Sequence, residues 1–292
     1  MTAKVGVRLW GNPEKDMETL QEWIVWCKSA GFDVVDVPRL TAQVKQAVTA
    51  ADLSIGTFDV GGTAALFSRD EAKRQAAAES VIAQLEDAAA LGGAKCFMCL
   101  VPEDITMQRR ESVALFAEVF PAIAAAAERL GIQIVLEGWP GPAPFYPTLG
   151  CTPEVLRAMF AAVPSPALGF NYDPSHLVRL GVDYMRFLRE FGDRIGHVHG
   201  KDCHVSTEDV YLYGRHQAAA IDKPAGFSEG PWRYTIPGEG DVDWTAVAFE
   251  LHRIGYQGAV CIELEDDQYW GPADNRKRGI TKAGEHLFRC FR

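Results

Sequence analysis

The chain lacks any long apolar run and any excess of positive charge. It has 292 residues, a net charge of −10, and 48% hydrophobic residues. No stretch approaches the roughly 20 apolar residues that cross a bilayer, and an acidic chain is a poor partner for a nucleic-acid backbone or an anionic membrane. The N-terminal residues contain no basic segment followed by an apolar one, so we expect no signal peptide and a cytoplasmic location. These absences argue against nucleic acid and membrane as partners and favour an ordinary globular protein.

A second cysteine pair is also absent. Cys96-Phe-Met-Cys99 has the spacing of a redox or zinc pair. It lies in a strand-like run, where residues three apart point to opposite faces, and no other pair exists to complete a zinc site. We therefore expect the seven cysteines to be small, mostly buried residues in a reducing compartment.

What the chain does contain is a regular alternation of short β-branched runs and longer helical stretches. The predicted strands are Val5–Trp10, Val34–Val37, Ser54–Asp59, Lys95–Val101, Ile132–Glu137, Leu168–Asp173, Ile195–His199 and Ala259–Glu263. The predicted helices are Asp16–Ala30, Thr41–Ala51, Asp70–Leu91, Gln108–Leu130, Thr152–Ala162, Val182–Phe191, Val242–Ile254 and Ala283–Phe291. Such alternation predicts a parallel sheet, and eight units predict closure into a (β/α)8 TIM barrel. No composition shift marks a boundary, so one domain over residues 1–292 is expected.

One segment, Cys203 to Trp244, breaks this rhythm. It holds glycine, proline, aromatic and charged residues without a clean period. We expect a long loop between the seventh and eighth strands, because long loops in compact domains are usually lids or binding loops.

Four of the predicted strands end in a residue that can bind a metal ion. These residues are Glu137, Asp173, His199 and Glu263. In a parallel barrel the carboxyl ends of the strands meet at one mouth. Three carboxylates and one imidazole form a set rich in hard oxygen, which favours Mn²⁺ or Mg²⁺ and also permits Co²⁺ or Zn²⁺. The sequence therefore predicts one divalent metal ion, with Mn²⁺ as the expected choice.

Strand pleating identifies further candidate site residues on the seventh strand. His197, His199 and Lys201 share one face, because alternate residues of a strand point the same way. His197 lies deeper, and we interpret it either as a support for the ligands or as a core histidine. Lys201 lies at the rim, where it contacts substrate or pairs with an acid.

Three more residues are candidates for substrate binding. His176 follows Asp173 in a Pro-containing turn and leans over the mouth or is a surface histidine. Arg233 offers a planar fork for substrate oxygens, with a solvated loop arginine as the alternative. Trp139 offers a flat apolar face to a sugar ring or packs the rim.

Several motifs together resemble the xylose-isomerase-like sugar isomerase/epimerase family, and the resemblance covers nearly the whole chain. The motifs are Leu136-Glu137, Asn171-Tyr-Asp-Pro-Ser-His-Leu177, His197-Val-His-Gly-Lys-Asp202, Ile236-Pro-Gly-Glu-Gly-Asp-Val-Asp-Trp244 and Gly255-Tyr-x-Gly-x-x-x-x-Glu263. The resemblance implies that the four residues at the strand ends bind one divalent metal. It also implies that Glu137 and Glu263 exchange protons with substrate, that His176 and Arg233 contact substrate oxygens, and that the protein is a homo-oligomer.

Two features depart from the ketose 3-epimerases of that family. The stretch Gly138-Trp-Pro-Gly-Pro-Ala-Pro144 lacks their further glutamate, and the Cys203–Tyr234 loop is longer. The Gly-Trp-Pro-Gly-Pro and Trp-Arg-Tyr sequences are closer to members associated with 3-keto-glycosides, among which are epimerases and lyases.

The predicted function is a metal-dependent sugar isomerase or epimerase. Proton abstraction beside a carbonyl would pass through a metal-stabilised enediolate, with Glu137 and Glu263 as the acid/base pair. The alternative is a β-eliminating lyase on 3-keto-glycosides or related keto-sugars, which could need a small partner subunit. A non-catalytic sugar-binding subunit is a further alternative. The endonuclease of abasic DNA shares this kind of barrel but uses three zinc ions and early histidines, whereas no histidine precedes His176 here.

Overall fold

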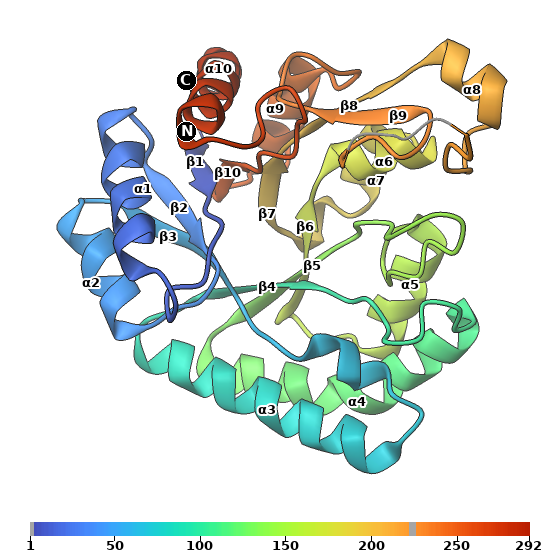
Figure 1. Ribbon diagram of the computed structural model, residues 1–292. Coiled ribbons are helices and arrows are strands. Elements are labelled where there is room, and N and C mark those ends of the chain that lie inside the picture. Colours follow the sequence, from blue (N-terminus) through green and yellow to red (C-terminus); the bar gives the residue numbers. More distant parts are fainter. Residues whose placement is uncertain (1–2, 222–225) are drawn as a thin grey trace.

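Eight parallel strands form a closed barrel (Figure 1). The computed structural model of the protein describes residues 3–221 and 226–292. Around the barrel the strand order is β1-β10-β7-β6-β5-β4-β3-β2. The strands are β1 Lys4–Arg8, β2 Val34–Val37, β3 Ser54–Asp59, β4 Lys95–Cys99, β5 Gln133–Glu137, β6 Leu168–Tyr172, β7 Ile195–Gly200 and β10 Ala259–Ile262. All eight predicted strands are present, so the TIM-barrel prediction is confirmed.

Helices cover the outside of the barrel. They are α1 Met17–Ser29, α2 Ala42–Ala50, α3 Glu71–Ala90, α4 Arg109–Leu130, α5 Pro153–Ala162, α6 Pro174–Leu180, α7 Tyr184–Glu190, α9 Trp244–Arg253 and α10 Ala273–Phe291. Short 3-10 helices occupy Thr63–Phe67 and Gly192–Arg194. Asp16, Thr41 and Asp70 begin the first three helices by accepting a backbone N–H bond three residues on. No helix within the described ranges is both long and apolar enough to cross a membrane.

Two helix predictions needed correction. Helix α10 begins at Ala273, ten residues before the predicted start at Ala283. Its first half is strongly charged, so its sequence pattern is weak, and it is held by tertiary contacts such as that of Arg276 over Trp23 at 4.8 Å. Helix α6 occupies a place where only a turn was expected after Asp173. Pro174 at its first position and the left-handed cap at Gly181 define this short helix.

The predicted loop between the seventh and eighth strands also contains regular structure. Strands β8 (Asp202–Val205) and β9 (Trp232–Thr235) pair antiparallel, and helix α8 (Thr207–Tyr213) lies between them in sequence. Figure 1 shows this pair to one side of the barrel mouth, with α8 beyond it. The strands are only four residues long and pair across a long connection, which is why their periodicity is weak. Residues 222–225 of the predicted loop lie outside the described residues.

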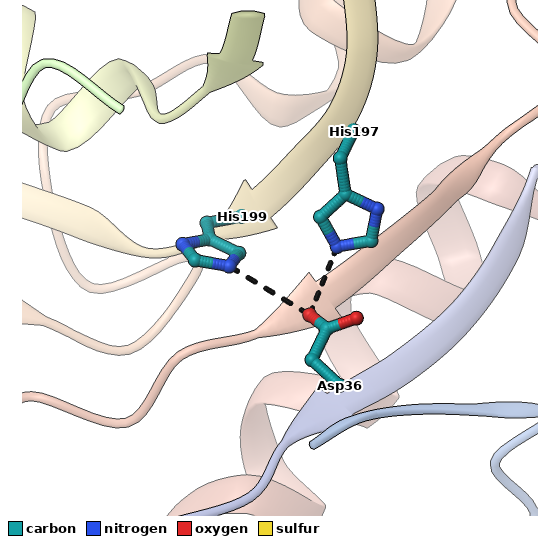
Figure 2. A group of neighbouring side chains, drawn as sticks. All are labelled: Asp36, His197 and His199. Carbon is teal, nitrogen blue, oxygen red and sulfur yellow. Dashed lines mark hydrogen bonds and ion pairs between the residues drawn. The ribbon is translucent and has the colours of Figure 1, made fainter. Parts of the chain in front are cut away.

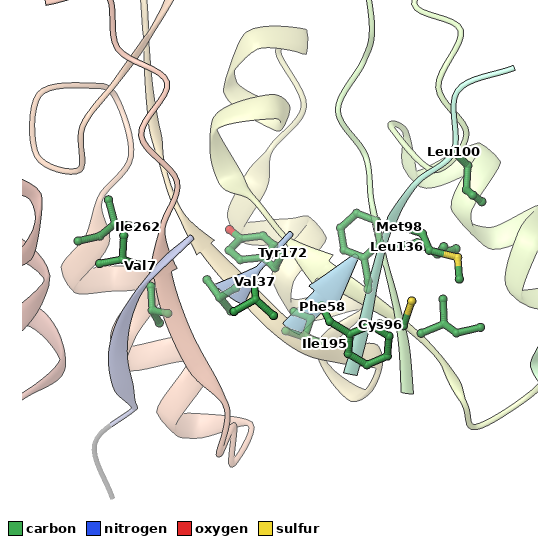
Figure 3. Packing of buried hydrophobic residues seen from close by; sticks show 14 of the residues in the cluster. Val7, Val37, Phe58, Cys96, Met98, Leu100, Leu136, Tyr172, Ile195 and Ile262 are labelled. Carbon is green, nitrogen blue, oxygen red and sulfur yellow. The ribbon is translucent and has the colours of Figure 1, made fainter. Parts of the chain in front are cut away.

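The main core lies between the outward faces of the strands and the helices. Figure 3 shows buried residues from successive strands, including Val7, Val37, Phe58, Leu136 and Ile262, packed in one cluster. A separate cluster of Val34, Ala259 and Cys261 shares the inward faces of its strands. The lower part of the barrel interior also holds Lys95, whose Nζ donates to the backbone oxygen of Gly196.

Candidate metal centre

Barrel closure brings the four predicted metal ligands to one mouth. Glu137 is the last residue of β5, Asp173 caps α6 just after β6, His199 lies in β7, and Glu263 follows β10. In the strand register, Glu137 is beside Asn171, and His199 is beside Cys261. All four ligand side chains are buried, with 5% exposure or less.

His199 contacts both glutamates directly. Nδ1 of His199 lies 2.7 Å from Oε2 of Glu137 and 3.3 Å from Oε2 of Glu263. Glu137, Asp173, Glu263 and His176 each offer a ligand atom, and these four atoms lie within 4.8 Å of one another. The three predicted acids thus group with His176, whereas His199 groups with Asp36 and His197 and reaches Glu137 and Glu263 through Nδ1.

The donor set fits a divalent cation. Oδ2 of Asp173 and both ring nitrogens of His199 are buried and make no hydrogen bond within the described residues. Buried polar atoms without partners are rare in native proteins and need an explanation. Carboxylate oxygens with one or two imidazoles suit Mn²⁺, Mg²⁺, Co²⁺ or Zn²⁺. A cation among the acids would satisfy Oδ2 of Asp173 and Nδ1 of His199.

Lys201 lies within the same acidic cluster. Its Nζ is 2.5 Å from Glu263, 2.9 Å from Glu265 and 3.2 Å from Asp173. Burial alone would lower the pKa of Lys201, but these carboxylates raise it well above its ordinary value, so the ammonium keeps its charge. Of the two readings left open by the sequence, pairing with acids is the one observed. Lys201 therefore offsets part of the negative charge of the cluster.

The two glutamates are ionised at neutral pH. Burial and mutual repulsion raise the pKa of Glu137, but His199 and His176 lower it below its usual range. Burial also raises the pKa of Glu263, and Lys201, His199 and Arg8 lower it well below its usual range. For His199, the opposing charges of Glu263 and Glu137 outweigh burial and raise the pKa. Both carboxylates are thus available to accept a proton or a cation.

His176 is buried rather than on the surface. Its Nδ1 forms a 2.7 Å hydrogen bond with the hydroxyl of Tyr234. Its Nε2 lies 3.2 Å from Asp173 and 3.4 Å from Glu137. The ring therefore faces the acids, while its contact with substrate stays a prediction.

The other two predicted substrate residues lie on flanking segments. Arg233, in β9, donates to Oδ1 of Asp266 at 3.0 Å and keeps a 30% exposed side chain. Trp139 is half-buried just after β5. Their roles in substrate binding stay predictions.

Sequence reasoning missed two charged residues inside the barrel. Asp36 lies below the acids, with its Oδ2 2.9 Å from Nε2 of His197 (Figure 2). Nε of Arg8 is 3.0 Å from Glu263, and its other nitrogens bond to both oxygens of Asp59. The sequence offered a signal for each residue. Asp36 lies between valines in Val34-Val-Asp-Val37, and Arg8 ends the first strand.

Comparison with known proteins places the chain in a family. Residues 24–290 match the family model described as xylose isomerase-like TIM barrel. The chain belongs to the xylose isomerase-like TIM barrel family. The resemblance inferred from the motifs is therefore confirmed.

Sequence matches to individual relatives cover only part of the chain. The uncharacterised protein YfiH of Bacillus subtilis is 33% identical over 169 residues, 57% of this chain and 50% of YfiH. An inosose dehydratase of Lactiplantibacillus plantarum is 31% identical over 116 residues, 40% of this chain and 36% of the dehydratase. The aligned stretches thus span half or less of each relative. The 3-keto-D-glucoside 4-epimerase YcjR of E. coli has a similar fold, with a TM-score of 0.69, 17% identity, and coverage of 97% of this chain and 99% of YcjR.

Proposed function

We propose that the protein is a metal-dependent isomerase or epimerase of a sugar or keto-sugar. The observation that carries the proposal is the placement of two buried, ionised glutamates, Glu137 and Glu263, against one imidazole nitrogen of His199. Family membership supports an enzyme of sugar chemistry, because named relatives include an inosose dehydratase and the fold resembles a 3-keto-glucoside epimerase.

The chain supplies two acid/base groups and a binding frame. A divalent cation held by Glu137, Asp173, His199 and Glu263, Mn²⁺ by preference, would polarise the carbonyl oxygen of the substrate. One ionised glutamate removes the proton beside that carbonyl, and the other returns a proton that it has first taken from water. Return to the opposite face of the same carbon inverts it, whereas return to the neighbouring carbon moves the carbonyl. His176, Arg233 and Trp139 are the groups that we assign to substrate binding, and Lys201 balances the charge of the acids.

Hydrogen exchange with solvent tests this assignment. The wild-type protein with Mn²⁺ should transfer deuterium from D₂O to the carbon beside the carbonyl of a ketose or a 3-keto-glycoside, followed by NMR or mass spectrometry. Glu137→Gln and Glu263→Gln should each reduce the exchange rate at least 100-fold, since loss of a positioned acid/base group costs 10²–10⁴-fold.

A matched control is Glu250→Gln, because Glu250 is a buried carboxylate on the outer helix α9. This variant should exchange at the wild-type rate. Metal content is measured in every variant to separate lost proton transfer from lost metal. Wild-type exchange in both site variants would defeat the proposal.

A lyase is the second candidate, and the inosose dehydratase relatives favour it. The same first abstraction followed by departure of a β-substituent would release water from a keto-sugar that carries a β-hydroxyl, or the aglycone alcohol from a 3-keto-glycoside. Mass spectrometry of the products distinguishes the two reactions, because epimerisation or isomerisation leaves the mass unchanged. A product lighter by one water, or by the aglycone alcohol of a 3-keto-glycoside, would assign the lyase.

A further inference from the structure

Two exposed tryptophans contact each other beyond the carboxyl ends of β1 and β10. All seven tryptophans of the chain fall within the described residues, and Trp10 (39%) and Trp270 (38%) are the most exposed of them. Their ring centroids are 6.2 Å apart, and the rings meet edge to face. Because β1 and β10 are neighbouring parallel strands, both rings lie at the mouth of the barrel, on the side of Glu263.

The turn that carries Trp270 also holds a residue that we assign to substrate binding. The backbone N–H groups of Tyr269 and Trp270 donate to the carbonyl oxygen of Asp266 at 3.0 and 2.8 Å. The carboxylate of Asp266 accepts a 3.0 Å hydrogen bond from Arg233. Phe227, which precedes β9, packs edge to face against Trp270, with the centroids 5.2 Å apart. The ring of Trp270 is therefore fixed in place without being buried.

One side chain separates these rings from the acids. The guanidinium carbon of Arg8 lies 5.2 Å from the ring centroid of Trp10, and its Nε lies 3.0 Å from Oε1 of Glu263. Trp139, which we assign to the sugar ring, follows β5. Strand β5 lies opposite β1, because β10, β7 and β6 separate the two on one side and β2, β3 and β4 on the other. The predicted metal ligands therefore lie between aromatic side chains on two opposite sides of the mouth.

We propose that Trp10, Trp270 and Phe227 form a subsite for the aromatic aglycone of a glycoside substrate. The inference rests on the proposed function, because that function places the keto-sugar ring at the acids. A single sugar ring at the acids leaves both tryptophans facing solvent, whereas an aryl group attached to that ring extends over Arg8 to them. Ligand sites are lined mainly by apolar and aromatic side chains, and aromatic rings pair edge to face or offset. The subsite therefore favours aryl glycosides over free ketoses, which carry no aglycone.

Paired glycosides test this subsite. Phenyl and methyl glucosides of the same anomeric form differ only in the aglycone, and without a carbonyl they bind without reacting. Calorimetry with the Mn²⁺-loaded wild-type protein should give a Kd about 10-fold lower for the phenyl compound in at least one anomeric form. Equal Kd values, or no binding of the phenyl glucoside, overturn the inference, and this comparison needs no variant to fold.

Trp270→Leu should remove most of the preference for phenyl and leave the Kd of the methyl glucoside unchanged. Trp26→Leu is the matched control, because Trp26 is half-buried on the outer helix α1, where it packs against Trp23 and Phe32. This control should keep the wild-type preference. If Trp270→Leu changes the oligomeric state seen by light scattering and leaves both Kd values unchanged, the rings form a contact between copies of the chain and the inference fails.

Deuterium exchange into methyl 3-keto-glucoside reports on the proposed function separately. Exchange without a preference for phenyl leaves the proposed function standing and overturns the subsite. A preference for phenyl that Trp270→Leu removes, without exchange, supports the subsite and defeats the proposed reaction.

Discussion

Arg8 is a buried charge that bridges two carboxylates at the mouth of the barrel. It is 7% exposed, bonds to both oxygens of Asp59, and lies 3.0 Å from Glu263. Its guanidinium also lies over the ring of Phe97, 4.4 Å from the centroid. Arg8 therefore holds one oxygen of Glu263 while the other faces His199 and Lys201.

Removing this arginine should destabilise the protein strongly. Arg8→Met leaves buried carboxylates without their partner, which costs about 3–5 kcal/mol of unfolding free energy. Urea denaturation of the ion-free protein measures the change.

Arg69→Met is the control for that experiment. Arg69 also bonds to two carboxylates, Glu111 and Asp104, but its side chain is 58% exposed. Its loss should cost far less than the loss of Arg8, because solvent screens exposed ion pairs. Equal losses in the two variants would show that burial does not set the strength of the Arg8 contacts.

At the scale of elements, Asp202 anchors the β8–β9 pair to the segment before α9. It accepts N–H bonds from Cys203, Gly238 and Val242 and from the indole of Trp244. Even with these four donors, burial raises the pKa of Asp202 to about 6. This segment carries Arg233 and Tyr234, so Asp202 also fixes the flank of the site.

The raised pKa predicts a pH-dependent contribution to stability. The folded state binds a proton at Asp202 more tightly than the unfolded state does, so this contribution is complete below about pH 4 and is lost as pH rises to about 6. The wild-type protein should lose about 3 kcal/mol of unfolding free energy over this range relative to Asp202→Asn, which cannot titrate.

Urea denaturation of both proteins between pH 4 and pH 7 tests this prediction. A stability difference that does not change with pH would mean that Asp202 has an ordinary pKa in the folded protein.

At the scale of the whole molecule, the centre joins strands that are distant in sequence. Glu137, Asp173, His199 and Glu263 lie in or directly after four strands of the closed barrel. A cation bound to these residues in the folded state alone stabilises that state by mass action. The homo-oligomer expected from the family resemblance stays a prediction, which light scattering of the purified protein can test.

Metal addition should therefore raise the melting temperature. At a free Mn²⁺ concentration 100 times the Kd, the expected gain is about 2.7 kcal/mol. A chelator should reverse the shift seen in a thermal melt. His199→Ala should show little shift, and a shift as large as that of wild type would place the bound metal elsewhere.

Much of this architecture was readable from local patterns. The eight strands, most helices and the four residues at the strand ends follow from periodicity and residue type, which depend on neighbours in sequence. Sequence patterns did not predict helix α6, strands β8 and β9 or the first half of α10. These elements are short or are stabilised by tertiary contacts. The sequence could not decide whether Lys201 contacts substrate or pairs with an acid. The three-dimensional structure shows that it pairs with acids.

The sequence by itself determined that strands alternate with helices eight times and that acids and histidines end four of the strands. Only the tertiary structure decided which charges meet inside the barrel. Asp36 and His197 are 161 residues apart, and Arg8 and Asp59 are 51 apart. Alternation within a strand says which residues share a face, but the closure and register of the sheet decide which side chain lies opposite, and these are properties of the whole chain.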